Sequence, residues 1–221
     1  MSNKMAFEAL EYDDKINKTV PYYQDFFIQT INLIKIYLNK PITWLDIGCG
    51  TGKMAEVAFK NTEIDQFVFC DSSKEMIEIV KERFQRNNSA FITKSVFDLS
   101  YENQFDVVTS ILVFHAFTYE NRIKAIKKCY QALKKDGIFI TFENFAPFTS
   151  QGTELFLKRW RAYQFKQGKS LEECNKHIAR YNQNYFPISI FEHIEIIKQC
   201  GFKTVEIFWL SNMQVGLMAI K

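Results

Sequence analysis

The chain has 221 residues, 47% of them hydrophobic, and a formal net charge of +3 from 28 basic and 25 acidic side chains. This composition is too apolar for a disordered chain, and the length suits one domain with an addition or two very small domains. The charge is too small and too evenly mixed to favour a nucleic-acid partner, and no apolar run is long enough to span a bilayer.

The first 15 residues mix acidic side chains with lysines, unlike a secretory signal peptide, so we expect a cytoplasmic protein. Five widely spaced cysteines include no C-x-x-C pair, which disfavours a disulfide framework and a zinc site. We expect buried thiols in a reducing compartment, and no metal site.

In chain order, residues 1–40 form a separate helical segment, with helices expected over 6–17 and 21–38. A single domain over 41–221 follows. From residue 46 to about residue 142, apolar runs alternate with amphipathic helices, the pattern of a parallel sheet covered on both faces. Strands are expected at 42–47, 67–70, 90–93, 105–112 and 138–143, and helices at 51–59, 74–86 and 120–133, with a turn at Asp136-Gly137.

The pattern then changes. Residues 151–184 are polar and helical in texture, and they predict a helical cap inserted at about 150–187. A helix at 191–200 and strands at 205–209 and 215–220 follow, the two strands forming a closing hairpin.

The strongest motif is the run Trp44-Leu45-Asp46-Ile47-Gly48-Cys49-Gly50-Thr51-Gly52, in which a strand ends in an acid and alternate glycines open a helix. Glycines there permit a tight turn and let a ligand approach the backbone closely. Asp71 ends the second strand, 19 residues after Gly52, and is placed to accept hydrogen bonds from both ribose hydroxyls of a nucleoside. Asp98 follows the third strand, where Phe97 and its neighbours would flank an adenine ring.

With these motifs, and with FDVVTSILVFHAF at 105–117 and LKKDGIFIT at 133–141, the chain resembles the class I S-adenosylmethionine-dependent methyltransferases. The resemblance implies an α/β, Rossmann-like, seven-stranded, mostly parallel sheet with an antiparallel last strand, in agreement with the closing hairpin. It implies S-adenosylmethionine as cofactor and S-adenosylhomocysteine as product. The cofactor-binding residues that it implies are Asp46, Gly48, Cys49, Gly50, Asp71, Ser72, Met76, Phe97, Asp98, Ser110 and Ile111. A nicotinamide dehydrogenase is disfavoured because the run is G-x-G-x-G rather than G-x-G-x-x-G.

Methyl transfer from a sulfonium is an in-line displacement that depends mainly on positioning and desolvation, so a catalytic base is not obligatory. His115, after the fourth strand, is the best candidate base, and Glu143, at the end of the fifth, is the second; Asn144 beside it is also placed to reach an acceptor. His177 and His193 fall in surface-like helical patterns and are expected to be bystanders.

Specificity for the methyl acceptor should come from the variable segments. Tyr12, Tyr22 and Tyr23 of the N-terminal segment, with Trp160, Tyr163 and Phe165 of the cap, are candidates for an aromatic lid that favours a sulfonium and excludes water. Among them Tyr22 is expected to meet the cofactor, and Tyr12, Trp160 and Tyr163, together with His115, the acceptor. Arg159 and Arg161 flank Trp160 and are candidates to hold an acidic acceptor.

Three functions remain open. The first is transfer of a methyl group to an O, N or S atom of a small molecule. The second is the activity of the carboxy-S-adenosylmethionine synthases of tRNA wobble-uridine modification, which the segments at 20–23, 167–170 and 201–209 resemble, although no basic residue is evident to hold the extra carboxylate. The third is non-catalytic binding of the cofactor. RNA methylation, with a nucleic-acid partner that the small net charge disfavours, is a lesser alternative. The protein is expected to be a monomer or a homodimer.

Overall fold

The computed structural model describes residues 11–221. The helices are α1 (Tyr12–Thr19), α2 (Tyr23–Tyr37), α3 (Lys53–Asn61), α4 (Lys74–Arg83), α5 (Tyr119–Ala132), α6 (Ser150–Lys166), α7 (Leu171–Ile178) and α8 (Ile190–Gln199), with short 3-10 turns η2 (Val96–Asp98) and η3 (Phe114–Ala116). The strands are β1 (Ile42–Ile47), β2 (Ile64–Asp71), β3 (Ser89–Thr93), β4 (Phe105–Ile111), β5 (Leu133–Asn144), β6 (Thr204–Ser211) and β7 (Gln214–Ile220).

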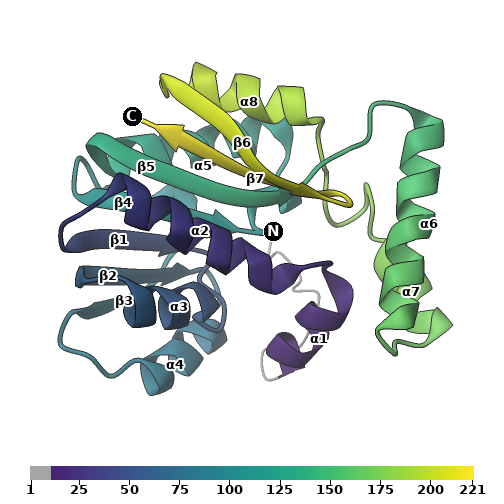
Figure 1. The fold of residues 1–221 in the computed structure, drawn as a ribbon, viewed down its shortest axis with the longest axis horizontal. Helices are drawn as coiled ribbons and strands as arrows, with labels where there is room; N and C mark the ends of the chain where they lie inside the picture. Colours follow the sequence, from purple (N-terminus) through teal and green to yellow (C-terminus); the bar gives the residue numbers. More distant parts are fainter. Residues whose placement is uncertain (1–10) are drawn as a thin grey trace.

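The seven strands form one sheet in the order β3-β2-β1-β4-β5-β7-β6 (Figure 1). Neighbours among the first five strands are parallel, and β7 runs antiparallel to both β5 and β6. The expected seven-stranded, mostly parallel sheet with an antiparallel last strand is thus confirmed. The strand order reverses between β1 and β4, and in such sheets ligands bind outside the carboxyl ends of the strands at this point.

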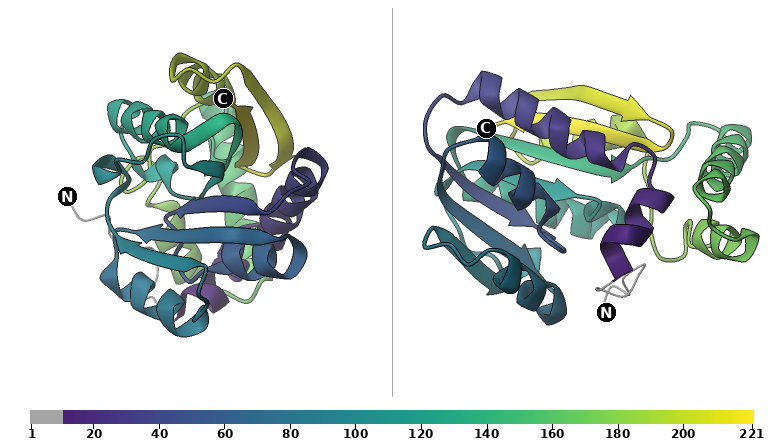
Figure 2. Two further views of the ribbon diagram at one scale, coloured as in Figure 1. Left: turned by 90° about the vertical axis from the view of Figure 1, so that its left-hand side faces the viewer. Right: turned by 60° about the horizontal axis from the view of Figure 1, so that its bottom comes forward.

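Helices cover both faces of the sheet, with α2, α3 and α4 on one face and α5 and α8 on the other (Figure 2). Neighbouring residues of β1 show the consequence: Trp44 packs into the core beneath α2 and α3, Leu45 packs into the core beneath α5 and α8, and both are fully buried. A strand covered on both faces reads as a continuous apolar run, which is why the sequence marked β1 so clearly.

The cap consists of α6 and α7, which lie beyond the carboxyl ends of the strands (Figure 1). The sequence predicts helical structure over 151–184, and in the structure this stretch forms two helices, α6 and α7. Gly168, with φ of 87°, lets the chain turn between the two helices, and a reciprocal capping box between Ser170 and Glu173 begins α7. The last part of the predicted stretch, after residue 178, is irregular.

Several predicted boundaries move. Tyr22 takes the left-handed conformation, with φ of 55°, so α2 begins at Tyr23 rather than at residue 21. The helix predicted over 6–17 is described only from Tyr12, because residues 6–10 lie outside the described part of the chain. Asp136 and Gly137 do not form a separate turn but lie inside β5, at a shift of its register against β4.

Two further expectations can be compared with the described residues. All five cysteines are buried free thiols, as expected. No helix within residues 11–221 combines the length and apolarity needed to cross a membrane.

Candidate functional site

The glycine-rich turn between β1 and α3 is the centre of the site. Gly48, Gly50 and Gly52 all have positive φ, at 67°, 53° and 85°. The amides of Gly48 and Cys49 donate to the carbonyl of Cys70 at 2.7 and 3.1 Å, which joins the turn to the end of β2. A Cβ placed on Gly50 would meet nothing within 4 Å, so the turn presents an open stretch of backbone to a ligand.

Asp71, the last residue of β2, supports this turn. Its carboxylate accepts hydrogen bonds from the Gly50 amide at 3.1 Å and from the Ser73 amide at 2.8 Å. Burial raises the pKa of Asp71, although the amides of Ser73, Gly50 and Ser72 partly oppose that rise. The bonds from Gly50 and Ser73 therefore fix the Asp71 carboxylate beside the glycine turn.

Asp46 lies deeper, on β1, and is almost fully buried. The Trp44 indole donates to Thr109 Oγ1 at 2.8 Å, and that hydroxyl donates to Asp46 Oδ1 at 2.7 Å. Burial raises the pKa of Asp46 to about 7; the Thr109 bond lowers it and the charge of Asp71 raises it further. A buried acid of this kind is ready to become a carboxylate beside a cationic ligand group.

We expect Asp46→Asn to stabilise the protein above pH 7. The folded-state pKa near 7 lies above the ordinary value of 3.8, so this carboxyl's contribution to stability is present below pH 4 and is lost as the pH rises towards 7. The gain should reach up to about 4 kcal/mol at pH 8, measured by urea unfolding between pH 4 and pH 8.

Asp106→Asn serves as a control of opposite sign. Burial alone would raise the pKa of Asp106, but bonds from Lys40, Thr43 and Lys134 hold it well below its usual range. Its contribution is therefore present above the ordinary pKa and lost in acid, so the substitution should destabilise the protein at neutral pH. If the free energy of unfolding of wild type and of Asp46→Asn depended on pH in the same way, the raised pKa of Asp46 would be contradicted.

Tyr12 and Tyr23 close one side of a narrow cavity whose other walls include Asp46, Gly48, Gly50 and Ile111. The two tyrosine hydroxyls hydrogen-bond to each other. Burial, followed by the charges of Asp71 and Asp13, raises the pKa of Tyr12 to about 12. Both tyrosines therefore stay neutral and place aromatic surface over the glycine turn.

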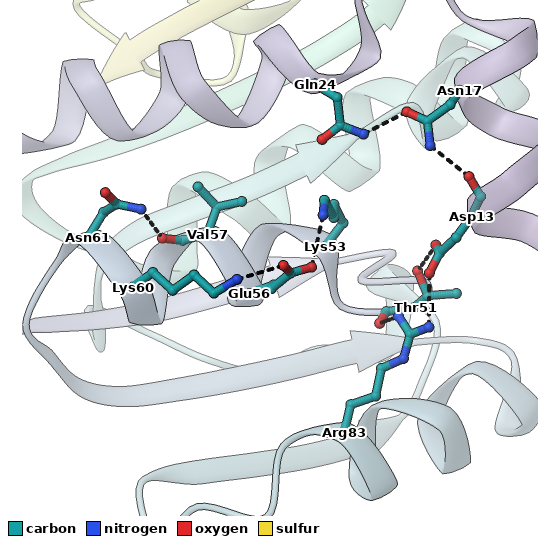
Figure 3. Close-up of polar contacts among 10 residues, drawn as sticks. All are labelled: Asp13, Asn17, Gln24, Thr51, Lys53, Glu56, Val57, Lys60, Asn61 and Arg83. Atoms are coloured by element: carbon teal, nitrogen blue, oxygen red, sulfur yellow. Dashed lines mark hydrogen bonds and ion pairs between the residues drawn. The ribbon is translucent and has the colours of Figure 1, made fainter.

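Polar contacts of Asp13 with Thr51 and Arg83 hold α1 in this position (Figure 3). The Thr51 hydroxyl donates to Asp13 Oδ1 at 2.5 Å, and Arg83 Nη2 pairs with Asp13 Oδ2 at 2.9 Å. Arg83 Nη1 also donates to the Thr51 carbonyl at 2.8 Å. This contact could not be predicted from the sequence, because the charges of Asp13 and Arg83 on exposed helix positions give no signal of a partner distant in the chain.

The remaining predicted cofactor residues differ in how exposed they are. Met76 and Ser110 are buried, Ile111 and Cys49 line the cavity, Phe97 is half-buried, and Ser72 and Asp98 are exposed. Tyr22 is 57% exposed and lies beside Tyr163 rather than in the cavity wall. Tyr23, the neighbouring candidate for the aromatic lid, lines the cavity.

His115 and Glu143 form a second polar group, in which Glu143 lies near the end of β5 and His115 follows β4. Glu143 Oε2 accepts from the His115 amide at 2.7 Å and faces His115 Nδ1 at 3.1 Å. Its other oxygen accepts from the Phe114 amide at 3.1 Å and the Thr141 hydroxyl at 3.0 Å. Burial alone would raise the pKa of Glu143, but the bond from His115 and the surrounding positive groups lower it. This carboxylate is therefore arranged to orient His115.

Arg122, which the sequence analysis did not single out, supports the same turn. It is fully buried, and it donates from Nε to the Phe114 carbonyl at 3.1 Å and from Nη2 to the Phe186 carbonyl at 2.8 Å. The Phe186 amide in turn donates to the His115 carbonyl at 2.6 Å. The chain leaving the cap is thus fixed to the turn that carries His115.

The aromatic side chains predicted to form the cap's part of the lid differ in exposure, and Phe165 is 55% exposed. Trp160 lies in the core of the cap, and its indole donates to the Thr19 carbonyl at 2.6 Å, while the Tyr163 hydroxyl donates to the Asn17 carbonyl at 3.4 Å. Both residues therefore join α6 to α1, whereas Arg159 and Arg161 are exposed.

The two bystander histidines are also not surface residues. His193 is only 1% exposed, and burial lowers its pKa to about 4. His177 is half-buried, with its Nδ1 3.0 Å from Gln164 Nε2 and its ring 4.9 Å from that of Trp160. The surface positions predicted for His177 and His193 are wrong, because α7 and α8 each turn the imidazole ring of their histidine towards the interior.

Comparison with known proteins adds independent findings. A family model described as a methyltransferase domain matches residues 45–141. The carboxy-S-adenosyl-L-methionine synthase of Nautilia profundicola is 27% identical over 96% of this chain and 92% of its own length. The malonyl-[acyl-carrier protein] O-methyltransferase of Priestia megaterium is 28% identical over 85% of this chain and 71% of its own.

Among solved structures, the YcgJ protein from Bacillus subtilis superimposes with a TM-score of 0.67. The match covers 90% of this chain and 99% of that one at 15% identity, and this likeness shows the shared fold.

Proposed function

We propose that the chain is a class I S-adenosylmethionine-dependent methyltransferase that transfers a methyl group to an O, N or S atom of a small molecule. The observation that carries the proposal is the pairing of the glycine turn with the acids that end β1 and β2. Asp71 bonds the turn directly at Gly50, and Asp46 lies buried behind it.

The residues present fit this cofactor. The open backbone at Gly50 and the carboxylate of Asp71 suit the ribose side, and the buried acid Asp46 suits an amino group. When bound, S-adenosylmethionine supplies a methyl group made electrophilic by a sulfonium. Tyr12 and Tyr23 cover the cavity with neutral aromatic surface, which excludes water and is compatible with a nearby cation.

His115 is the residue we assign to proton removal from the acceptor. The carboxylate of Glu143 can only accept, so it holds the proton on His115 Nδ1 and leaves the lone pair on Nε2. Glu143 itself is buried with four hydrogen bonds, which makes it a positioning residue for His115. Tyr185 packs edge-on to the His115 ring at 5.8 Å, on the side of the cap.

His115→Asn should lower turnover by about 100-fold or more, because the amide keeps an N–H towards Glu143 but has no basic nitrogen. Affinity for S-adenosylhomocysteine should change less than about threefold. Turnover is measured by release of S-adenosylhomocysteine with the first acceptor that a screen identifies. Lys124→Gln, an exposed position on α5 with no role in the site, is the control. Unchanged turnover in His115→Asn would exclude a catalytic base at this position.

A second candidate, synthesis of carboxy-S-adenosylmethionine, is favoured by one observation. The likeness to the Nautilia synthase extends over 96% of this chain, well beyond the methyltransferase model at 45–141. A carboxylated cofactor needs a cation nearby. Among the described residues that line the cavity, Lys53 is the basic one. It is the candidate to hold the extra carboxylate, and it is now paired with Glu56 at 2.9 Å.

The test is mass spectrometry of any ligand that co-purifies, followed by calorimetric titration with S-adenosylmethionine and S-adenosylhomocysteine. Methyl transfer predicts micromolar binding of both compounds and no carboxylated ligand. A co-purified carboxylated analogue would favour the second candidate. Binding without turnover of any acceptor would favour a non-catalytic binding protein, and no binding at all would reject the cofactor assignment.

A further inference from the structure

Two buried amides face each other where β5 ends and β7 begins. Asn144 and Gln214 are partners in the antiparallel ladder, 5% and 0% exposed, and Gln214 Nε2 donates to Asn144 Oδ1 at 2.9 Å. Within residues 11–221, Gln214 Oε1 is buried without a hydrogen-bond partner. Leaving such a group unpaired costs about 1–3 kcal/mol, so its retention needs an explanation.

The pair is related to the cofactor cavity through strands β4 and β5. Asn144 shares a face of β5 with Phe142, because side chains two residues apart point the same way. Phe142 is the ladder partner of Ile111, which lines the cavity. Asn144 is therefore about 7 Å further along the strand direction than this wall.

The residue directly before Gln214 packs against the cap. Met213, directly before Gln214, is fully buried in one apolar cluster with Trp160 and Tyr185 of the cap segment. Its carbonyl accepts from the Phe145 amide at 2.9 Å, which fixes the beginning of β7 against the end of β5. The amide pair thus lies at the carboxyl end of β5, two residues beyond Phe142 at the cavity wall and directly after Met213 of the cap cluster.

The chemistry of the pair restricts what binds. One bond between two primary amides leaves one oxygen and one NH2 group, whichever way the amides are turned. Together they complement a neutral group that carries a hydrogen-bond donor beside an acceptor. A carboxylate offers only acceptors and would leave Gln214 Oε1 facing another lone pair.

We propose that Asn144 and Gln214 form a binding subsite for the methyl acceptor, which takes a neutral carboxamide or lactam in preference to a carboxylate. The inference rests on the proposed function and names the chemical class of its acceptor. The other possible occupant is an internal water molecule, which would satisfy Gln214 Oε1 without selecting among ligands.

Benzamide and benzoate are suitable probes because they share a ring and differ only in the group that the subsite would read. Each is titrated by NMR into protein saturated with S-adenosylhomocysteine. Wild type should bind benzamide at least tenfold more tightly than benzoate. Gln214→Glu and Gln214→Met should both lose that preference, and Met keeps the side chain's length if the buried charge prevents folding.

Glu206→Gln, which alters an exposed position on the neighbouring strand β6, is the matched control and should keep the preference. Equal binding of the two probes, binding of neither, or a preference that survives both Gln214 variants would overturn the subsite. If S-adenosylhomocysteine itself fails to bind, the proposed function fails, which is a separate result from loss of the benzamide preference.

Discussion

Asp71→Ala is expected to weaken binding of S-adenosylmethionine by about 100-fold or more, with the fold intact. Hydrogen bonds to a charged group contribute about 1.5–3 kcal/mol each, so the loss of two ribose contacts alone reaches this effect. The substitution also frees the amides of Gly50 and Ser73, which Asp71 now holds at 3.1 and 2.8 Å. The glycine turn would then be less well ordered before the ligand arrives.

Calorimetry with S-adenosylhomocysteine measures this loss, and circular dichroism shows whether the variant folds. Asp65→Ala is the matched control, because Asp65 is an exposed acid on the same strand β2. It should bind like wild type. If a folded Asp71→Ala protein bound the cofactor normally, the assignment of Asp71 to the ribose would be wrong.

The sheet could be predicted from the sequence because its signals are local. The apolar run of β1 is followed by Gly48 and that of β2 ends at Asp71, and the acids Asp46 and Asp71 stand where those two strands end. Parallel strands bring their carboxyl ends to one edge, so chain order alone predicts that these acids lie close together.

What escaped prediction depends on contacts distant in sequence or on a single backbone angle. Asp13 bonds Thr51 from 38 residues away, and Trp160 bonds Thr19 from 141 residues away. The beginning of α2 at Tyr23 follows from a positive φ at Tyr22 that no composition signals. The role of Glu143 also needed the structure, because only its four contacts show that it faces His115 rather than open space.

These long-range bonds give α1 two attachments. Its first turn is tied to the glycine turn by Asp13, and its last residue is tied to the cap by Trp160 (Figure 3 shows the first of these). Helix α1 therefore connects the glycine turn to the cap, in addition to the contacts that Phe186 and Met213 make between the cap segment and the sheet.

Gly48→Ala and Gly50→Ala should separate stability from cofactor binding. Both glycines have positive φ, 67° and 53°, so each substitution carries a backbone cost of about 1–2 kcal/mol. A Cβ on Gly48 would also lie 2.3 Å from Val113 Cγ2, and overpacking of this kind adds about 1–3 kcal/mol. Gly48→Ala should therefore lose about 3 kcal/mol of stability, roughly twice the loss in Gly50→Ala.

The order should reverse for ligand affinity. A Cβ on Gly50 points into space that is empty within 4 Å at the cavity wall, where the cofactor must approach the backbone. Gly50→Ala should lose at least about tenfold in affinity for S-adenosylhomocysteine, because the methyl group takes the place of ligand atoms. Urea unfolding and calorimetry on both variants measure the two quantities. If Gly50→Ala bound the ligand like wild type, the cofactor would not contact the turn at Gly50, and the open backbone there would need another explanation.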